Sequence, residues 1–334
     1  MKKGVFVTGA TGFIGSHITK YLQKESFQVY ALTRKGSVAK FGKTKSLHLI
    51  FGDITKKNLG IAKKDLEKLS KNVGYFIHCA ALYGTGESRQ KLFKVNVVGT
   101  RNALALARRL PKLSLMSYVS TVYVSGAMEG ILAEDSLPAV KSFHNDYEEA
   151  KFIAESLVRK SKLPAVIFRP PIVVGHSKTG KALRFNGIYK VIEAIYKKRL
   201  FFYPGDCHGP IYLVPVDIVA EFISWVGVRE KFEGLTFNLV EPQPPTYREF
   251  FRKTARLLKV SSPYFIFPEG LWRILIKFSS IIPFVNTKPL LMFGQRLIVE
   301  NKNYLTTLRQ MGKTHPEVKT YHKNILRYFI KKYA

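Results

Sequence analysis

Short apolar runs alternate along the first half of the chain with longer segments in which apolar residues recur every three or four positions. The short runs are typical of buried strands, and the longer segments are typical of helices that bury one face. This alternation predicts an α/β fold with a parallel, doubly wound sheet. The predicted strands lie at about residues 3–8, 28–33, 46–51, 73–79, 113–119 and 164–168.

Two predicted helices are especially clear. One runs from about Ser88 to Arg109 and ends before Pro111, and the other runs from about Asp146 to Ser161 and ends before Pro164. Proline lacks the amide hydrogen that a helix interior needs, so it ends both patterns.

The pattern changes after Arg169. Prolines, a loop at 175–181 that contains Gly and Lys, a helical segment at Asn186–Arg199 and a proline-rich turn at 242–245 follow. We therefore expect two interleaved lobes, a dinucleotide-binding Rossmann lobe and a smaller C-terminal substrate lobe. The expected boundaries are residues 1–170 for the first lobe, with elements at about 211–240 returning to it, and residues 171–334 for the second.

A glycine-rich turn joins the first predicted strand to the helix after it. Glycine allows a tight backbone turn, close approach to a pyrophosphate and close packing of helix on strand. The amino end of the next helix attracts phosphate groups. The turn therefore predicts a dinucleotide site, and its sequence is Thr8-Gly9-Ala10-Thr11-Gly12-Phe13-Ile14-Gly15.

The chain is strongly basic, with 54 Lys and Arg against 23 Asp and Glu and a formal net charge of +31. Such a surface attracts anions, for example a phosphorylated cofactor or substrate, an acidic carrier protein or an anionic membrane. Because the basic residues are spread along the whole chain, ordinary solvated lysine-rich faces explain them equally well. The sequence contains no nucleic-acid-binding motif, so we expect no nucleic-acid partner.

Cysteine and histidine usage limits the other classes of site. Cys79 and Cys207 are the only cysteines, so we expect no disulfide framework and a reducing compartment. The eight histidines are scattered without zinc-ligand spacing, and we expect no metal site. The first strand begins too close to Met1 for a signal peptide, which favours a cytoplasmic protein.

The stretch from Leu271 to Val299 is the most membrane-like part of the chain. Charged residues and prolines interrupt it, so it contains no span of about 20 apolar residues. We interpret residues 263–299 as part of an apolar substrate pocket that contains a buried helical pair. Peripheral attachment to a membrane surface is the second interpretation.

Tyr147 and Lys151 are four residues apart and share one face of the second clear helix. A phenol has a pKa of about 10, and lowering it to about 7 takes roughly 4 kcal/mol. A neighbouring ammonium and an oxidised nicotinamide supply much of this preference, which would make Tyr147 a general acid or base. Ser120 and Thr121 end the fifth predicted strand and complete the candidate set.

Together these motifs resemble those of the extended short-chain dehydrogenase/reductases, within the NAD-dependent epimerase/dehydratase superfamily. The resemblance extends from the amino terminus to about residue 245 and implies an NAD(P)-dependent oxidoreductase. Cys79 stands where the family often has asparagine. In family order, the motifs are the glycine-rich turn, Gly52-Asp53, His78-Cys79-Ala80-Ala81, Asn96-Val97-Val98-Gly99-Thr100, Val119-Ser120-Thr121, Tyr147 with Lys151, Arg169-Pro170 and Val216-Asp217.

The resemblance implies a role for each candidate catalytic residue. Tyr147 would pass a proton to the substrate oxygen, and Lys151 would hold the nicotinamide ribose and lower the pKa of Tyr147. Thr121, in preference to Ser120, would bind the substrate oxygen, and Asn96 would support a proton relay or the local helix backbone. Asp53 would bind the adenine amino group. The implied cofactor-binding residues are Thr8, Gly9, Thr11, Gly12, Phe13, Ile14, Gly15, Arg34, Lys35, Asp53, Ile54, Ala80, Ala81, Tyr147, Lys151 and Pro170.

The end of the second strand bears on the choice of cofactor. NAD enzymes of this fold usually place an acid there, which would repel a 2′-phosphate. This chain has Arg34 and Lys35 instead, which favours NADP(H). If these are ordinary loop cations, NAD(H) remains an alternative.

The segment from Arg169 to Gly180 is similar to one in thioester reductases and fatty acyl-CoA reductases. Residues 175–182 nearly match the phosphate-binding loop of nucleotide triphosphatases. That loop needs Ser or Thr to bind magnesium where this chain has Ala182, so we do not expect a triphosphatase site. We therefore expect an NADPH-dependent reductase of a carbonyl or acyl thioester on a lipid-like substrate, or on one bound to CoA or an acyl carrier protein.

Three alternatives remain open. The first is a 3β-hydroxysteroid or dihydroflavonol type of dehydrogenase, which shares the catalytic residues. The second is a sugar-nucleotide epimerase or dehydratase, and the third is a non-enzymatic NADP-sensing protein. Because relatives in this family commonly dimerise through the two long helices, a homodimer is also an expectation.

Overall fold

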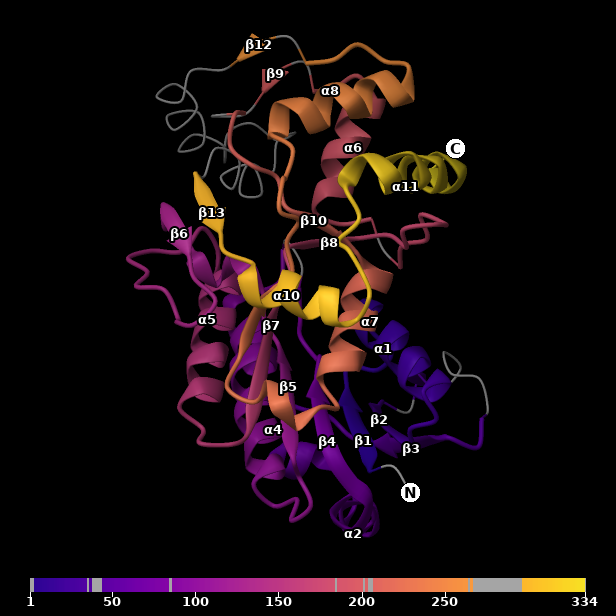
Figure 1. Ribbon diagram of the computed structural model, residues 1–334, viewed down its shortest axis with the longest axis vertical. Coiled ribbons are helices and arrows are strands. Elements are labelled where there is room, and N and C mark those ends of the chain that lie inside the picture. The colour runs from indigo at the N-terminus through magenta and orange to yellow at the C-terminus, as the bar shows by residue number, and fades with distance from the viewer. Residues whose placement is uncertain are drawn as a thin grey trace.

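A seven-stranded parallel sheet forms the centre of the larger lobe (Figure 1). Its strand order is β11-β7-β5-β4-β1-β2-β3, and each neighbouring pair is parallel. This confirms the predicted doubly wound fold and the six predicted strands. The strands are β1 (Gly4–Thr8), β2 (Val29–Thr33), β3 (Leu47–Phe51), β4 (Val73–His78), β5 (Leu115–Val119), β7 (Ala165–Arg169) and β11 (Thr236–Asn238).

The computed structural model describes most of the chain. The described residues are 3–34, 36–37, 44–83, 86–183, 185–200, 202–203, 207–263, 265–266 and 296–333.

Helices cover both faces of the sheet because side chains of a strand alternate between its two faces. Val5 and Val7 of β1 face one core with helices α1 (Phe13–Lys24), α7 (Val216–Val226) and α10 (Lys302–Gln310). Phe6, between them, faces the other core with α2 (Lys63–Asn72), α4 (Gly99–Ala107) and α5 (Asp146–Arg159). Strand order reverses at β1, which lies between β2 and β4, so the crevice beside its carboxyl end is the usual ligand position in such sheets.

The helix predicted at 88–109 is confirmed and contains one irregular turn. It begins as α3 (Arg89–Phe93), continues as a π-helical turn at Lys94–Val98, and becomes α4. Such π turns are uncommon and often mark functional sites. Asn96 lies in this turn.

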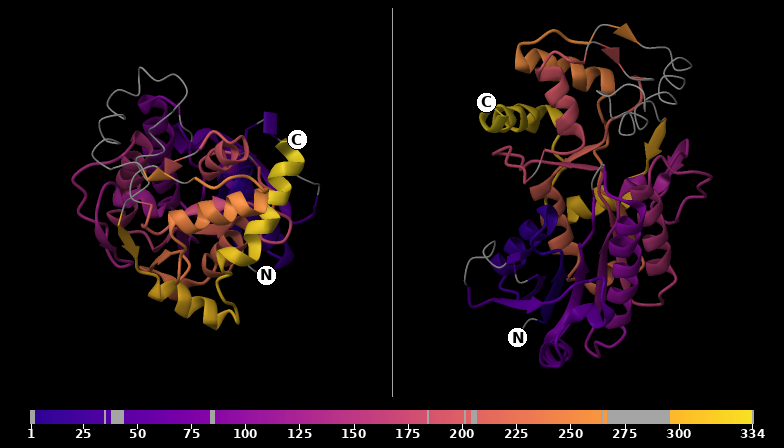
Figure 2. Two further views of the ribbon diagram at one scale, coloured as in Figure 1. Left: turned by 90° about the horizontal axis from the view of Figure 1, so that it is seen from above. Right: turned by 180° about the vertical axis from the view of Figure 1, so that it is seen from behind.

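The smaller lobe stands on one end of the sheet, and the amino terminus lies at the other end (Figures 1 and 2). Its core joins helices α6 (Ile188–Tyr196), α8 (Tyr247–Leu258) and α11 (Val318–Tyr333). α8 begins with a capping box in which Thr246 and Glu249 exchange hydrogen bonds. The predicted helix at 186–199 is confirmed as α6.

Three short two-stranded parallel sheets connect distant parts of the chain. Among the described residues they pair β8 (Ile172–Val174) with β10 (Leu213–Pro215), β9 (Phe202–Tyr203) with β12 (Phe265–Ile266), and β6 (Gly130–Leu132) with β13 (Leu297–Val299). Short 3-10 helices lie at Lys57–Gly60, Val122–Ser125 and Glu230–Phe232.

Late elements rejoin the larger lobe. β11 forms an edge of the central sheet, and α7 packs on α1. Tyr304 and Leu308 of α10 also belong to the core of the larger lobe. The lobe boundaries at residues 170 and 171 stay a prediction.

The membrane-like stretch at 271–299 lies mostly outside the described residues. Its described end is the strand β13, in which Leu297 and Val299 are buried and Ile298 is exposed. The expected buried helical pair is therefore wrong for these last residues. Within the part of the chain that the structure describes, no helix has both the length and the apolar character needed to cross a bilayer.

Candidate active site

The glycine-rich turn lies between the carboxyl end of β1 and the start of α1. Gly9 has a φ of +71°, and a Cβ added there would stand 2.7 Å from the Ala80 nitrogen. A Cβ on Gly15 would stand 2.2 Å from the Gly9 oxygen. Gly12 is the N-cap of α1 and supplies no side-chain cap, so the first amides of the helix point out without a side-chain acceptor. These residues fit a dinucleotide pyrophosphate, which such a turn binds.

The other predicted turn residues divide between the two lobes. Ile14 packs against the core of the larger lobe, whereas Phe13 packs against the core of the smaller lobe. Thr11 is half-buried in the turn itself. The first residues of α1 therefore contact both lobes.

Thr8 belongs to a buried chain of hydrogen bonds that also contains His78 and Thr100. The Thr8 Oγ1 lies 2.7 Å from His78 Nδ1, and His78 Nε2 lies 3.2 Å from Thr100 Oγ1. Thr100 donates its own proton to the Asn96 carbonyl at 2.6 Å, so His78 carries its proton on Nε2 and accepts from Thr8. Burial lowers the pKa of His78 to about 3, which keeps the ring neutral. The Thr8 hydroxyl is thus committed to the protein interior.

Asn96 holds the backbone of the loop that follows β4. Its Oδ1 accepts a 2.8 Å hydrogen bond from the Leu82 nitrogen, and its Nδ2 donates a 3.0 Å hydrogen bond to the Leu82 oxygen. The Asn96 side chain therefore supports the backbone of the loop after β4, and not the backbone of its own helix.

Lys151 is only 2% exposed and points at the end of β5. Its Nζ donates to the Tyr118 hydroxyl at 2.7 Å and to the Val119 carbonyl at 2.8 Å. Burial lowers the pKa of Lys151 to about 8. The ammonium is thus mostly charged at pH 7 and can lose its proton slightly above it.

Tyr147 lies one helical turn before Lys151. Its ring contacts the ring of Tyr83 edge-on, with centroids 4.9 Å apart and planes at 81°. Burial raises the pKa of Tyr147 above its ordinary value, and Tyr83 and Glu148 raise it further. Lys151 donates its hydrogen bonds to Tyr118 and Val119 here, and its expected lowering of the Tyr147 pKa stays a prediction. A raised pKa keeps the phenol protonated at neutral pH.

The two hydroxyl residues after β5 have different partners. Ser120 donates a 2.6 Å hydrogen bond to Glu155, a buried carboxylate. Thr121 caps the next 3-10 helix by accepting from the Tyr123 nitrogen at 3.3 Å, and donates to the Pro170 oxygen at 3.3 Å. Because Ser120 is directed at Glu155, Thr121 is the better candidate for contact with a substrate oxygen.

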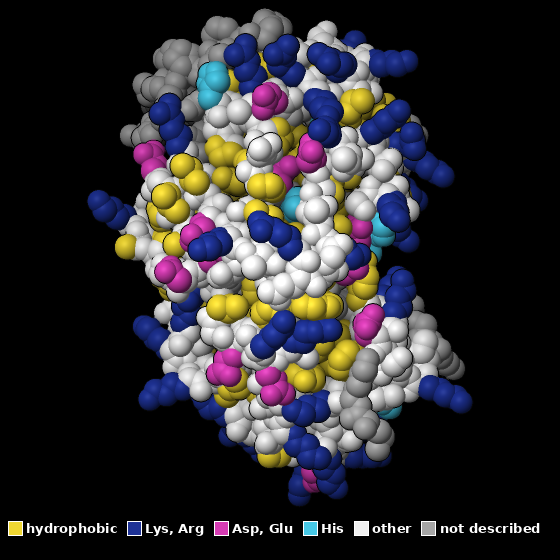
Figure 3. All heavy atoms as spheres, viewed as in Figure 1, with side chains coloured by type: hydrophobic (Ala, Val, Ile, Leu, Met, Phe, Trp, Pro, Cys, Tyr) yellow, Lys and Arg dark blue, Asp and Glu magenta, His cyan; other side chains and the backbone are white. Residues whose placement is uncertain are grey.

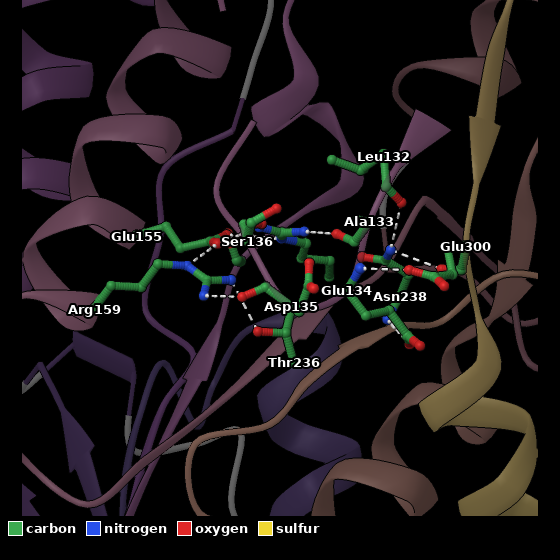
Figure 4. Close-up of polar contacts among 12 residues, drawn as sticks. Leu132, Ala133, Glu134, Asp135, Ser136, Glu155, Arg159, Thr236, Asn238 and Glu300 are labelled. Carbon is green, nitrogen blue, oxygen red and sulfur yellow. Dashed lines mark hydrogen bonds and ion pairs between the residues drawn. The ribbon is translucent and has the colours of Figure 1, made fainter. Parts of the chain in front are cut away.

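A buried ion pair, which the sequence analysis missed, supports this region (Figure 4). Arg169 Nη2 lies 2.6 Å from Glu155 Oε1, and both side chains are fully buried. Arg169 also donates to the carbonyls of Ala133 at 2.8 Å and Ser136 at 2.7 Å. Burial acts to raise the pKa of Glu155, but Arg169 holds it below its ordinary value. The available signal in the sequence was the position of Glu155, which follows Lys151 by four residues and so shares its face of α5.

A second buried carboxylate, Glu134, joins three segments in the same view (Figure 4). It accepts hydrogen bonds from the backbone nitrogens of Asn238 at 2.9 Å and Asn303 at 2.6 Å. Asn303 lies in the first turn of α10, so Glu134 caps that helix from another part of the chain. Burial raises the pKa of Glu134 to about 7.

The expected adenine end lies beside β2 and β3. Arg34 is exposed directly after β2, whereas Lys35 lies outside the described residues. Burial acts to raise the pKa of Asp53, but hydrogen bonds from Thr55 and the charges of Lys56 and Arg34 hold it below its ordinary value. The Ile54 carbonyl accepts a 2.9 Å hydrogen bond from Asn102, which ties this loop to α4.

Ala80 and Ala81 follow β4 beside the glycine-rich turn. The Ala80 backbone is so close to Gly9 that position 9 has no room for a side chain, and the Ala80 nitrogen donates to Thr8 at 3.4 Å. Cys79 stands just before them, and burial raises the pKa of its thiol to about 12. This thiol is therefore neutral at ordinary pH.

Comparison with known proteins places this geometry in context. A protein-family model described as "Male sterility protein" matches residues 7–223. The fatty acyl-CoA reductase wat of Drosophila melanogaster is 30% identical over 287 residues, which cover 69% of this chain and 56% of that protein. The L-2-aminoadipate reductase of Schizosaccharomyces pombe is 30% identical over 257 residues, which cover 66% of this chain and 18% of that protein. The chain therefore spans little more than half, or less, of these curated relatives.

A solved structure shows the same fold over the full length. It is the terminal R domain from the myxalamid PKS-NRPS biosynthetic pathway, with a TM-score of 0.82 and 24% identity, and the match covers 99% of this chain and 91% of that one. Both lobes therefore have a counterpart in that protein.

Proposed function

The chain belongs to the male sterility protein family of the extended short-chain dehydrogenase/reductases, a group of NAD(P)-dependent oxidoreductases, and we propose that it is an NADPH-dependent reductase of acyl thioesters or related carbonyls. The observation that carries this proposal is the position of Tyr147 and Lys151 on one helix face near Cys79, whose backbone lies against Gly9 of the glycine-rich turn. Among the described residues, the Tyr147 hydroxyl has no hydrogen-bond partner, so it is available to a ligand.

Tyr147 can act as the proton donor in the reductive direction. Its phenol is protonated at neutral pH, and burial raises its pKa further above the ordinary value. Reduced nicotinamide, when bound, would be the source of the hydride that the carbonyl carbon accepts. Tyr147 then gives its proton to the carbonyl oxygen, and Thr121 donates a hydrogen bond to the same oxygen. With a thioester, the resulting hemithioacetal then loses its hydroxyl proton as the carbon–sulfur bond breaks, and the departing thiolate takes up a proton, so the products are an aldehyde and a free thiol.

Lys151 has two roles in this proposal. Its ammonium, held by Tyr118 and Val119, would bind the nicotinamide ribose hydroxyls. Its charge would also favour the phenolate that forms when Tyr147 gives up its proton. Re-protonation of Tyr147 completes the cycle.

Arg34 supports NADPH as the cofactor. It is exposed immediately after β2, at the position where an acid in NAD enzymes binds the ribose hydroxyls. A guanidinium binds a 2′-phosphate with two parallel hydrogen bonds. Use of NADH is the alternative outcome.

The charge of the smaller lobe supports an anionic carrier of the acyl group. Lys and Arg side chains gather over this lobe (Figure 3). Two rows of exposed cations lie along its helices at a spacing of three or four residues, which places each row on one helix face. These rows are Arg248, Arg252, Arg256 and Lys259 at α8, and Lys319, Lys323, Arg327 and Lys331 on α11. CoA phosphates or an acidic carrier protein would complement these cations, and an anionic membrane surface is the other candidate partner.

The test is a substrate panel with the purified protein. We expect NADPH oxidation with acyl-CoA or carrier-bound acyl thioesters, together with release of free thiol in equal amount. Turnover confined to hydroxysteroids or sugar nucleotides would favour one of the alternative dehydrogenase or epimerase functions. Cofactor binding without turnover of any class would favour an NADP-sensing protein.

A further inference from the structure

Tyr83 spans the gap between the two lobes directly beside Tyr147. Its ring stands edge-on against the Tyr147 ring, with centroids 4.9 Å apart. Its hydroxyl lies 3.2 Å from the position that a Cβ on Gly187 would occupy. Gly187 is the N-cap of α6 in the smaller lobe. The side chain therefore begins in the loop after β4 in the larger lobe and reaches the first turn of a helix in the other.

The backbone of this loop is held, but the side chain of Tyr83 is not. Asn96 bonds both the nitrogen and the oxygen of the preceding residue, Leu82. Tyr83 itself is 50% exposed, and its hydroxyl has no hydrogen-bond partner among the described residues. The ring is therefore positioned by packing against Tyr147 rather than by a hydrogen bond.

Other aromatic rings converge on the same place from separate elements. Burial raises the pKa of Tyr123, and Tyr247, Tyr83 and Tyr147 are close enough to raise it further. Tyr123 follows β5, and Tyr247 begins α8. The ring faces of such residues supply apolar wall area against which an acyl chain can pack. Within this set, Tyr83 is the most exposed wall.

We propose that Tyr83 closes the substrate pocket over Tyr147 and limits the size of the acyl group that can reach it. This inference rests on the proposed function, because it takes Tyr147 as the proton donor. The Tyr83 ring, rather than its hydroxyl, does the closing. A truncated side chain would leave a path between the end of β4 and Gly187 for a bulkier chain and for water.

The first test compares acyl-CoA thioesters from acetyl to palmitoyl, with a branched acyl-CoA added. The proteins are the wild type, Tyr83→Ala and Tyr83→Phe. We expect Tyr83→Ala to raise kcat/KM for the bulkiest thioester, relative to the smallest, by about tenfold. Tyr83→Phe should keep the wild-type range because it keeps the ring.

The second test does not require turnover. It measures quenching of the fluorescence of bound NADPH by acrylamide. Tyr83→Ala should expose the bound nicotinamide to the quencher, and Tyr83→Phe should protect it as the wild type does. NADPH affinity is measured in parallel so that the fraction bound is the same in each sample.

The outcomes separate this inference from the proposed function. If the wild type reduces thioesters and Tyr83→Ala leaves their relative kcat/KM unchanged, the inference is overturned. The same holds if Tyr83→Phe behaves like Tyr83→Ala, because the hydroxyl would then be responsible. If the wild type reduces no thioester, the proposed function fails, and quenching decides about Tyr83: increased quenching in Tyr83→Ala supports the inference, and equal quenching overturns it.

Discussion

The Lys151 ammonium lies 2.7 Å from the hydroxyl of Tyr118, and this buried contact ties the helix that carries Tyr147 to the end of β5. The same ammonium bonds the Val119 carbonyl, immediately before Ser120 and Thr121. Lys151 therefore helps to position both Tyr147 and Thr121, the two residues proposed to contact the substrate oxygen. The protonation state of Lys151 should then affect the rate of the proposed reduction.

We predict that kcat/KM falls as the pH rises through about 8, because Lys151 then loses its proton. Below that pH the ammonium is present and binds the ribose. The measurement is the pH profile of kcat/KM for NADPH oxidation. In Lys151→Arg, whose guanidinium stays charged, any remaining activity should lack this descending limb. A wild-type profile that stays flat well above pH 8 would contradict the assigned role.

Replacing Tyr147 by Phe should lower kcat by about 10²- to 10⁴-fold because the proton donor is lost. NADPH binding should be unchanged, and it is measured from cofactor fluorescence. Tyr75→Phe in β4 makes the same chemical change away from the carboxyl end of the sheet and should keep full activity. Retained turnover in Tyr147→Phe would refute the assigned acid.

Thr121→Ala should lower kcat/KM by about 10²-fold, the usual effect of removing one donor to a developing oxyanion. Ser120→Ala is the matched control. It removes the hydrogen bond to Glu155 and should cost about 1.5–3 kcal/mol of stability with most of the activity retained. If the two variants exchange these effects, Ser120 is the substrate-binding residue.

Glu155→Ala should destabilise the protein by about 3–5 kcal/mol, because it leaves Arg169 buried without its carboxylate. The measurement is the free energy of unfolding in denaturant. Glu149→Ala, on the same helix, removes a partly exposed carboxylate that pairs with Arg89 at the surface, and its effect should be within about 1 kcal/mol. Equal effects of the two changes would show that the buried pair contributes little.

The pH dependence of stability should contain a contribution from Glu134. Its folded pKa, about 7, lies above the ordinary value of 4.5, so the folded state holds the proton more tightly than the unfolded state. The stabilisation is full below about pH 4.5 and is lost as the pH rises through about 7. The difference in unfolding free energy between the wild type and Glu134→Gln should therefore change between about pH 4.5 and pH 7. Above pH 7 this difference should stay constant. Parallel curves throughout would contradict the prediction.

Arg34→Glu should weaken NADPH binding by about tenfold or more and leave NADH binding nearly unchanged, because the added carboxylate repels the 2′-phosphate. Dissociation constants for both cofactors are measured by fluorescence titration. Arg101→Glu, at an exposed position on α4, controls for the change in net charge. An equal loss for both cofactors, or no loss, would place the phosphate elsewhere.

The local features of the fold were predictable from the sequence. Strand and helix patterns depend on residues close together in the chain, so the six strands, α5 and α6 were found. The glycine-rich turn was also predictable, because steric crowding at Gly9 and Gly15 excludes any side chain.

Contacts between distant residues were not predictable in the same way. The partners of Ser120 and Lys151 lie more than 30 residues away in the chain, and the packing of β5 against α5 determines them. The π turn at Asn96 has no local sequence signature. The position of Tyr83 depends on how the two lobes meet, which the patterns within either lobe do not specify. The roles of the candidate catalytic residues stay predictions until the variants above are measured.

Phe13, the first residue of α1, packs against the core of the smaller lobe, although the buried residues of α1 belong to the core of the larger lobe and the turn before α1 would bind the pyrophosphate. A rotation of one lobe relative to the other would therefore displace the amino end of this helix. Dinucleotide affinity and interlobe orientation are then thermodynamically coupled. Small-angle scattering with and without NADPH would detect that coupling as a change in radius of gyration, and Phe13→Ala should diminish the change.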